Sequence, residues 1–282
     1  MSNTARIGRA IDLHTHTTAS DGTLTPREVV ALAKELGLGA VAITDHDTVS
    51  GLAEALAAGE ETGMRVVPGV ELSSQLEQRE IHIVGLGIHR ESPALLALLA
   101  ERREARVRRN RQLLERLAEL GMVIPPEEVR SGSGLLTRTH VAEALARHGY
   151  AESTVDALQR YLIPGRPAWI AKKSPTPGEC AAVIHEAGGK AFLAHLDRID
   201  QRDPERGKRL AREALRMGLD GLEARYTTYT PAWEETADRM AAELGLLRSG
   251  GSDFHGARKS NRLGSGLGGL WVPEEWLREI LG

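Results

Sequence analysis

Short apolar runs alternate with amphipathic stretches over the first ninety residues of the chain. The apolar runs predict buried strands at residues 10–13, 40–44, 65–70 and 81–86. Helical spacing of apolar positions lies between them, at residues 26–36 and 50–62. Thr25 and Ser50 are suited to cap these two helices at their first turns. Strands that alternate with helices of this length predict βαβ units and a parallel sheet.

The same alternation returns in the last hundred residues. Strand-like runs there lie at residues 190–194, 221–224 and 246–249, and helical stretches at 177–187, 205–217, 231–244 and 273–281. The region between the two alternating parts shows helical spacing and no convincing strand. Seven strands, each usually followed by a helix, suit a β/α barrel better than a doubly wound sheet. We therefore expect an α/β barrel in two parts, residues 1–92 and 168–282, with an all-helical insertion at 93–167.

Composition excludes several classes of protein. Hydrophobic residues make up 41% and charged residues 27% of the 282 positions, which excludes disorder, collagen and coiled coil. A net charge of −3 argues against a bulk binder of polyanions, and 4% aromatic residues argue against a long stacking platform. The single cysteine, Cys180, excludes a disulfide framework within one chain. No signal peptide or membrane span is visible, so we expect a cytoplasmic protein without a membrane partner.

Side chains that can bind metal ions recur on the predicted strands, mostly where a strand ends. They come from six strands and comprise His14, His16, Asp21, His46, Glu71, His82, His195, Asp253 and His255. Active sites of β/α barrels lie at the carboxyl ends of the strands, so these side chains are expected to converge. One such histidine alone would more often be an ordinary polar residue. Nine of them at one topological position indicate a metal cluster.

The residue types and their spacing restrict the metal. His14 and His16 are two residues apart, as are Asp253 and His255, so each pair points the same way on an extended chain. Imidazoles with carboxylates and no thiolate suit Zn, Mn or Fe rather than Mg alone or Ca. Nine ligands are too many for one ion, so two or three divalent ions are expected. Asp45 is a candidate to orient an imidazole.

Six ordered motifs carry a resemblance to a known family. They are DLHTHTTASDG at 12–22, TDHDT at 44–48, PGVELS at 68–73, IHIVG at 81–85, AHLDR at 194–198 and GSDFHG at 251–256. Together they resemble the PHP (polymerase and histidinol phosphatase) family over residues 10–272. The resemblance implies a distorted (β/α)7 PHP barrel with a trinuclear metal site, its nine ligand positions falling on the nine residues above. Leu196 departs from the pattern, because the family usually has proline there.

The helical insertion is similar to that of one branch of this family. That branch comprises free-standing phosphoesterases that remove the 3′-phosphate of 3′,5′-nucleoside bisphosphates, and some degrade short 5′-phosphorylated RNA from the 5′ end. Its insertion carries an Arg-x-His and a later basic residue, which correspond to Arg138, His140 and Lys172. The resemblance thus implies a nucleotide, or short RNA, as substrate, with no obligate protein partner evident.

Phosphoester hydrolysis requires an activated water and positive charge around the phosphoryl group. A cluster of divalent ions, with Mn the first expectation, can lower the pKa of bound water toward 7. We interpret Asp253 and His255 as catalytic as well as metal-binding, and we place Arg138 and His140 with them. Substrate binding is assigned to Arg138, His140, Lys172 and Arg198, since such cations match phosphate groups. For each of these cations the alternative is an ordinary solvated charge.

Three other functions compete with a nucleotide phosphoesterase. A histidinol-phosphate phosphatase could use the same metal site, but the insertion suggests a wall that holds a base and ribose. A non-catalytic PHP module is disfavoured by the complete set of ligands. Amide hydrolysis is more distant still, since no lysine stands at a strand end as a bridge between metals. The basic stretch at residues 101–116, with seven Arg against three Glu, could guide RNA or be a solvated helix face.

Overall fold

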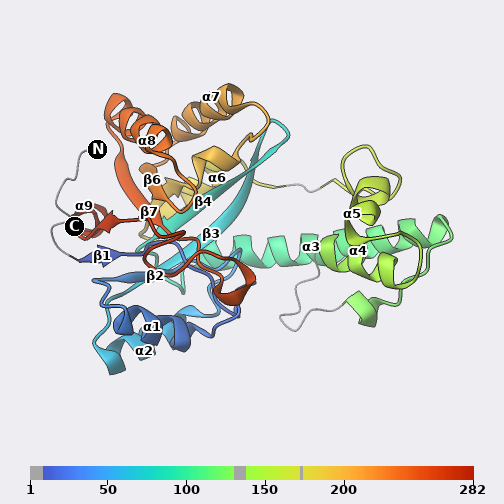
Figure 1. The fold of residues 1–282 in the computed structure, drawn as a ribbon, viewed down its shortest axis with the longest axis horizontal. Coiled ribbons are helices and arrows are strands. Elements are labelled where there is room, and N and C mark those ends of the chain that lie inside the picture. The colour runs from blue at the N-terminus through green and yellow to red at the C-terminus, as the bar shows by residue number, and fades with distance from the viewer. Residues whose placement is uncertain (1–8, 130–137, 172–173) are drawn as a thin grey trace. The chain divides into compact units, whose positions relative to one another are not determined.

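The computed structural model describes residues 9–129, 138–171 and 174–282. They form two compact units, one of the described residues up to Leu99 together with Ser174–Gly282, and one of Ala100–Lys173. The larger unit is built on a six-stranded sheet in the order β2-β3-β4-β5-β6-β7 (Figure 1). These strands are β2 Val41–Ile43, β3 Val66–Leu76, β4 Arg79–Leu86, β5 Lys190–Leu193, β6 Gly221–Tyr226 and β7 Leu247–Gly251. A two-stranded antiparallel pair, β1 Ala10–Ile11 with β8 Val272–Pro273, lies beside them.

Residues 12–16 join the two edge strands of the six-stranded sheet. On one side, the amide of Asp12 donates to the carbonyl of Ala40, the residue before β2. The carbonyl of Asp12 accepts from the amide of Ala42 within β2. On the other side, the amide of Leu13 donates to Gly250 of β7, and the amide of Asp253 donates to His14. Seven chain segments therefore close a ring of backbone hydrogen bonds. The distorted α/β barrel expected from the sequence is confirmed.

The direction of β4 corrects the expectation of a parallel sheet. β4 is antiparallel to both β3 and β5, whereas β2–β3, β5–β6 and β6–β7 are parallel. β3 continues to Leu76 and only residues 77–78 separate it from β4, too short a link for the crossover that parallel neighbours need. Glu77 in this turn has a φ of 51°. As a result Glu71 and His82 lie within a hairpin rather than at strand ends.

Helices of the larger unit are α1 Pro26–Glu35, α2 Leu52–Thr62, α6 Pro177–Glu186, α7 Pro204–Leu215, α8 Pro231–Leu244 and α9 Glu275–Leu281. Helix α1 begins as the sequence predicts, with Thr25 as N-cap in a capping box with Glu28. Ser50 does not cap α2, whose N-cap is Gly51 without a side-chain hydrogen bond; the Ser50 hydroxyl pairs with Thr48 instead. Short 3₁₀ turns η3 Leu196–Arg198 and η4 Gly256–Arg258 follow β5 and β7.

The core of the larger unit lies between its strands and its helices. Val29 of α1, Ile43 of β2, Ile184 of α6, Phe192 of β5 and Leu210 of α7 are all fully buried in one cluster. Helices α1 and α2 pack together, and α7 and α8 lie side by side elsewhere on the barrel (Figure 1). Burial on both faces explains the near-continuous apolar strands in the sequence.

The smaller unit has a hydrophobic core of its own. Its described residues form helices and turns: the second part of α3 Pro93–Glu119, η1 Pro126–Val129, α4 Arg138–Arg147, α5 Thr154–Ala157 and the π-turn η2 Leu158–Leu162. Leu117 of α3, Leu145 of α4 and Leu162 of η2 are fully buried together. Among the described residues of the whole chain, no helix is long and apolar enough to cross a membrane.

Candidate metal centre

Glu71 lies at the centre of the residues that the sequence singles out. Its two carboxylate oxygens contact five imidazoles, those of His14, His16, His46, His82 and His195. One oxygen, Oε2, lies 3.3 Å from His14 Nε2, 3.2 Å from His16 Nε2 and 2.8 Å from His46 Nδ1. The other, Oε1, lies 2.8 Å from His82 Nδ1 and 3.1 Å from His195 Nε2. The Glu71 side chain is buried, so this carboxylate gathers nitrogen ligands from four other chain segments.

The hairpin of β3 and β4 explains how two of these residues meet. His82 stands opposite Ser73 in the antiparallel register, and Glu71 is two residues before Ser73. Glu71 and His82 are therefore diagonal neighbours on the same face of the hairpin, where long side chains reach each other. The hairpin thus delivers a carboxylate and an imidazole together, although neither is at a strand end.

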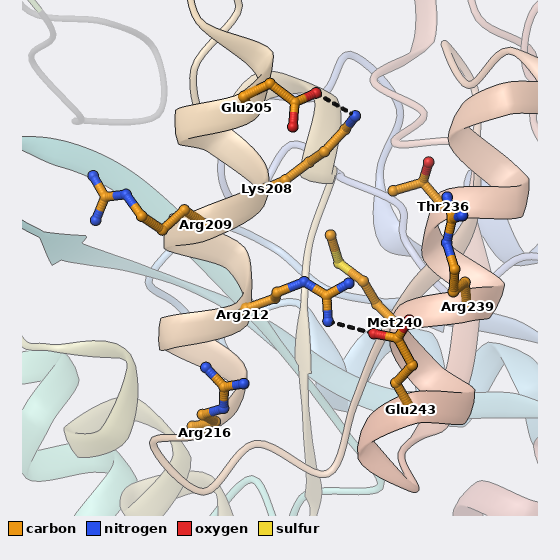
Figure 2. Close-up of a pocket in the computed structure, with 9 residues that line it drawn as sticks. All are labelled: Glu205, Lys208, Arg209, Arg212, Arg216, Thr236, Arg239, Met240 and Glu243. Atoms are coloured by element: carbon orange, nitrogen blue, oxygen red, sulfur yellow. Dashed lines mark hydrogen bonds and ion pairs between the residues drawn. The ribbon is translucent and has the colours of Figure 1, made fainter.

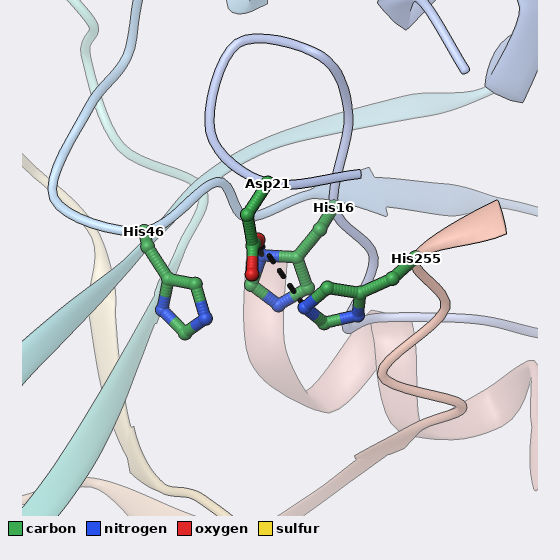
Figure 3. Close-up of side chains that lie close together, drawn as sticks. All are labelled: His16, Asp21, His46 and His255. Atoms are coloured by element: carbon green, nitrogen blue, oxygen red, sulfur yellow. Dashed lines mark ion pairs between the residues drawn. The ribbon is translucent and has the colours of Figure 1, made fainter. Parts of the chain in front are cut away.

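Asp21 gathers a second part of the cluster (Figure 3). Its Oδ1 lies 3.3 Å from His255 Nε2 and 3.9 Å from His16 Nδ1. The ring of His16 lies between its neighbours, with centroids 4.1 Å from His255 and 4.3 Å from His46. These four side chains come from three loops, and their potential ligand atoms all lie within 4.8 Å of one another.

Asp253 provides the third part. Its Oδ1 lies 3.2 Å from His16 Nε2 and 3.8 Å from His14 Nε2. The other oxygen, Oδ2, accepts hydrogen bonds of 2.8 Å from both the Tyr226 hydroxyl and the Lys259 ammonium. Two donors on Oδ2 fix the carboxylate with Oδ1 toward the imidazoles. Asp253 has a φ of 52°, so its backbone is held in the left-handed region that aims this side chain inward.

The nine side chains fit divalent cations. The potential ligand atoms of eight of them fall into three groups: His16, Asp21, His46 and His255; His14, His16 and Asp253; and His46, Glu71 and His82. The ninth, His195, lies 3.1 Å from Glu71 Oε1. Five buried atoms of the cluster have no hydrogen-bond partner: His14 Nε2, both ring nitrogens of His16, Glu71 Oε2 and His255 Nε2. Buried polar atoms without partners are costly and rare. A metal ion can be bound by imidazole nitrogens and carboxylate oxygens at once, which accounts for so many unpartnered polar atoms in one place.

The electrostatics of the cluster also favour positive charge. Burial opposes protonation of His16, but the carboxylates of Asp253 and Glu71 raise its pKa to about 9. Burial likewise opposes protonation of His82, while Glu71 and Glu80 raise its pKa to about 10. Despite its burial, Glu71 has a pKa well below its usual range because of the imidazoles around it. The carboxylates of the cluster therefore stabilise positive charge, whether it is carried by protons or by metal ions.

Glu223, an acidic residue behind the cluster, positions two of its members. Glu223 of β6 is buried, its Oε1 lies 2.8 Å from His14 Nδ1, and its Oε2 accepts from the amide of His195 at 2.6 Å. Such a carboxylate fixes which ring nitrogen of His14 faces the cluster. The predicted site residues do not include Glu223, although an acidic residue inside the apolar run of a buried strand is a signal for it. Lys259 and Tyr226 are not among them either, and no sequence pattern marks these two.

Asp45 does not orient an imidazole, contrary to our expectation. Its carboxylate accepts from the amide and hydroxyl of Thr17, both at 2.8 Å, and from the Ser20 hydroxyl. It therefore holds the loop that carries Asp21.

The departure from the family pattern at Leu196 has a local explanation, since the Leu196 amide donates to the Tyr229 hydroxyl at 2.7 Å. A proline there would have no N–H to donate.

A cleft of about 240 Å³ opens onto the cluster. It is lined by His46, Glu71, Glu80, Ile81, His82, His195, Arg198, Ile199, Asp253 and Lys259. Arg198 and Lys259 are the cationic side chains of this lining, and the Arg198 guanidinium lies 5.3 Å from the ring centroid of Tyr226. The cleft thus combines the metal-binding side chains with positive charge, an arrangement suited to a phosphate group.

The other residues assigned to substrate binding belong to the smaller unit. Arg138 and His140 lie in the first turn of α4, where Arg138 is exposed and His140 is half-buried. Lys172 lies outside the described residues. The structure therefore places Arg198 at the cleft and Arg138 and His140 together on α4.

Comparisons with known proteins agree with this geometry. The PHP domain model matches residues 12–162. The 5'-3' exoribonuclease Rnm of Escherichia coli is 36% identical over 93% of this chain and 89% of its own length. The 3',5'-nucleoside bisphosphate phosphatase of Chromobacterium violaceum is 34% identical over 89% of both chains. A solved structure from Bifidobacterium adolescentis, described as a metal-dependent phosphoesterase, has a TM-score of 0.78, 32% identity and coverage of 97% and 96%.

Proposed function

The chain belongs to the PHP family and is a metal-dependent phosphoester hydrolase, and from this premise we propose that it removes the 3′-phosphate of 3′,5′-nucleoside bisphosphates and degrades short 5′-phosphorylated RNA from the 5′ end. The proposal is carried by one observation above all. Two relatives named for these two activities each match about nine-tenths of the chain, and therefore both of its units. Both activities break a phosphoester bond at the 3′ oxygen of a nucleotide that carries a 5′-phosphate.

For the cofactor we propose two or three divalent ions, Mn first and Zn or Fe as alternatives. Three groups of potential ligands, linked by His16 and His46, support more than one ion. Six imidazoles among nine ligands favour Mn, Zn or Fe over Mg, which prefers oxygen. Bound ions of this kind would lower the pKa of water and offset charge on the phosphoryl group.

The protein's own side chains then have separable tasks. Glu71, with the imidazoles around it, would hold the cofactor, and Glu223 would keep His14 in the required orientation. Asp253 and His255 stand at the reacting centre, where Tyr226 and Lys259 fix the Asp253 carboxylate. Arg198, at the edge of the cleft, would pair with phosphoryl oxygens through its forked guanidinium.

We assign the recognition of the 5′-phosphate to the helical unit. Arg138 and His140 stand two residues apart at the start of α4, where backbone amides and the helix dipole also favour an anion. Lys172 is assigned to the same role. In this proposal the residues predicted as an insertion, 93–167, form a wall that holds the base and ribose.

A phosphate-release assay tests the substrate assignment. The Mn-loaded protein is offered 3′,5′-bisphosphates, 3′- and 5′-monophosphates, histidinol phosphate and short 5′-phosphorylated RNA. We expect the highest kcat/KM with the bisphosphate and measurable release of 5′-mononucleotides from RNA. If histidinol phosphate were the better substrate, the nucleotide assignment would fall and a histidinol-phosphate phosphatase would replace it.

A further inference from the structure

A second hollow lies between helices α7 and α8 of the larger unit (Figure 2). It has a volume of about 520 Å³ and shares no lining residue with the metal cleft. Its lining comprises Glu205, Lys208, Arg209, Arg212, Arg216, Thr236, Arg239, Met240 and Glu243. We call this hollow the α7–α8 groove.

The α7–α8 groove is strongly basic. Five cationic side chains line it against two glutamates, an excess of three positive charges in a chain whose net charge is −3. The glutamates are paired, Glu205 with Lys208 at 2.8 Å and Glu243 with Arg212 at 2.7 Å. Among the described residues no ion pair is found for Arg216 or Arg239, which line the groove and are both exposed. Arg209 is also paired, with Glu77 at 3.2 Å, so Arg216 and Arg239 carry the unneutralised charge that the groove presents to an anion.

The cations form a row rather than a point. Lys208, Arg212 and Arg216 are spaced four residues apart, so they follow one face of α7 and its C-terminal end with a rise of about 6 Å per step. Arg239 of α8 stands on the opposite side of the groove. A single phosphate group would use only one or two of these charges. A row of cations matches the repeated charge of a sugar-phosphate chain.

A series of contacts between aromatic rings links this groove to the metal cleft. The Tyr226 ring centroid lies 5.5 Å from that of His195 and 5.5 Å from that of Tyr229. Tyr229 in turn stacks on Trp233 at 6.2 Å, and the Lys208 ammonium lies 5.5 Å from the Trp233 centroid. The series of rings therefore runs from the cluster to the first cation of the groove. Because the Tyr226 ring is buried, these contacts show that the two sites are neighbours, and they do not form a surface on which bases stack.

We propose that the α7–α8 groove binds the downstream phosphates of a single-stranded RNA whose first phosphodiester bond lies in the metal cleft. The inference rests on the proposed function for the identity of the nucleic acid. The groove would add affinity for long strands and leave the hydrolysis of a mononucleotide unchanged, because a mononucleotide has no phosphate that could reach it.

A charge-reversal variant tests the groove without touching the cleft. Arg216→Glu combined with Arg239→Glu removes the two cations that have no carboxylate partner. The control, Arg65→Glu combined with Arg278→Glu, makes the same change in net charge at two other exposed arginines. For each Mn-loaded protein, kcat/KM is measured with a 3′,5′-bisphosphate and with 5′-phosphorylated RNAs of increasing length up to about 12 nucleotides, within the site sizes of single-strand binders.

In the wild type and the control, kcat/KM is expected to rise with RNA length. In the groove variant this rise is lost, with KM for the longest RNA increased about tenfold or more and bisphosphate turnover unchanged. The salt dependence of RNA binding should weaken too, its logarithmic slope falling by about 1.4 for two lost phosphate contacts.

Three results would overturn the groove as an RNA site. They are a wild-type kcat/KM that does not change with length, an equal loss in the control variant, and competition by polyglutamate as effective as that by RNA. Fluorescence anisotropy with a labelled RNA of about 12 nucleotides and the Mn-loaded proteins measures binding separately from turnover. RNA binding that depends on the groove, without hydrolysis of any substrate, would overturn the proposed function and support the groove as an RNA site. Hydrolysis of the bisphosphate without groove-dependent RNA binding would support the proposed function and overturn the groove as an RNA site.

Discussion

Glu71 shows how much of the metal centre depends on one buried carboxylate. It contacts five imidazoles and lies within the β3–β4 hairpin rather than in a loop. Its negative charge is what allows so many nitrogens to approach one another in the interior. Asp21 and Asp253 perform the same task at the edges of the cluster with fewer neighbours.

Replacing Glu71 by glutamine keeps the shape of the side chain and removes the charge. We expect metal content, measured by elemental analysis, and kcat/KM to fall together by more than about 100-fold, because loss of a partner behind a ligand already costs 10–100-fold. The exposed Glu77→Gln is the control and should retain both. Full activity in Glu71→Gln with little bound metal would contradict the cluster mechanism.

Glu223 is expected to act through His14 rather than on the substrate. Glu223→Gln should lower metal affinity by about 10–100-fold, because the amide no longer fixes the ring of His14 as an anion does. Metal titration of the chelator-treated protein measures the effect, and saturating metal should restore most of the turnover. A defect that excess metal leaves unchanged would instead place Glu223 in the chemistry.

At the scale of elements, the close approach of β7 to residues 12–16 is decisive. This contact closes the barrel and brings the loops of His14, His16 and Asp253 together. Gly251 makes the approach possible, because a Cβ there would collide with the backbone nitrogen and Cβ of His14. The β3–β4 hairpin provides Glu71 and His82 to the same cluster.

Gly251→Ala should therefore loosen both the barrel and the metal centre. Overpacking of this kind costs about 1–3 kcal/mol of the free energy of unfolding, which urea denaturation measures. Metal affinity should fall as well, because the displaced residue is a neighbour of the cluster. Gly269→Ala is the matched control, since no atom lies within 4 Å of a Cβ at that position. Equal stability of the two variants would show that this approach does not constrain the fold.

At the scale of the whole molecule, metal binding and folding are coupled. The buried ligand atoms without partners exist only in the folded larger unit, so ions that bind there stabilise it. The helical unit has a core of its own and does not share this dependence. Substrate recognition, in our proposal, requires both units.

Chelation should abolish activity and lower the melting temperature. Mn²⁺ added at about 100 times its Kd should restore activity and add about 2.7 kcal/mol to the free energy of unfolding. Calorimetry before and after the addition measures the second effect, and Mg²⁺ should be the weaker ion. Strict dependence on Mg²⁺, with no response to Mn²⁺, would contradict the proposed ligand chemistry.

Arg138→Ala tests whether the helical unit binds the 5′-phosphate while the larger unit carries out hydrolysis. Loss of one charge-assisted contact costs roughly 1.5–3 kcal/mol, so kcat/KM for the bisphosphate should fall about ten- to a hundredfold. A 3′-monophosphate never makes this contact and should be hydrolysed as before. Arg138→Lys, which keeps the charge but not the fork, should lie between the two. Equal losses with both substrates would place Arg138 elsewhere than at the 5′-phosphate.

From the sequence alone the barrel could be predicted, and a helical unit and a set of candidate ligands could be proposed. Alternation of apolar runs with helical stretches is set by local periodicity, which is why the helices and most strands lie close to where the pattern predicts them. His14, His16 and Asp253 could be predicted as neighbours because they follow strands of one barrel. The motifs around them carry the resemblance to the PHP family.

Only the tertiary structure decided the direction of β4, the central place of Glu71 and the partners behind the cluster. Strand direction depends on how two residues turn the chain at Glu77, a local detail that periodicity does not encode. Glu223, Tyr226 and Lys259 act through contacts between residues far apart in the chain. Distances across space are fixed by packing of the whole barrel, and no spacing along the sequence specifies them.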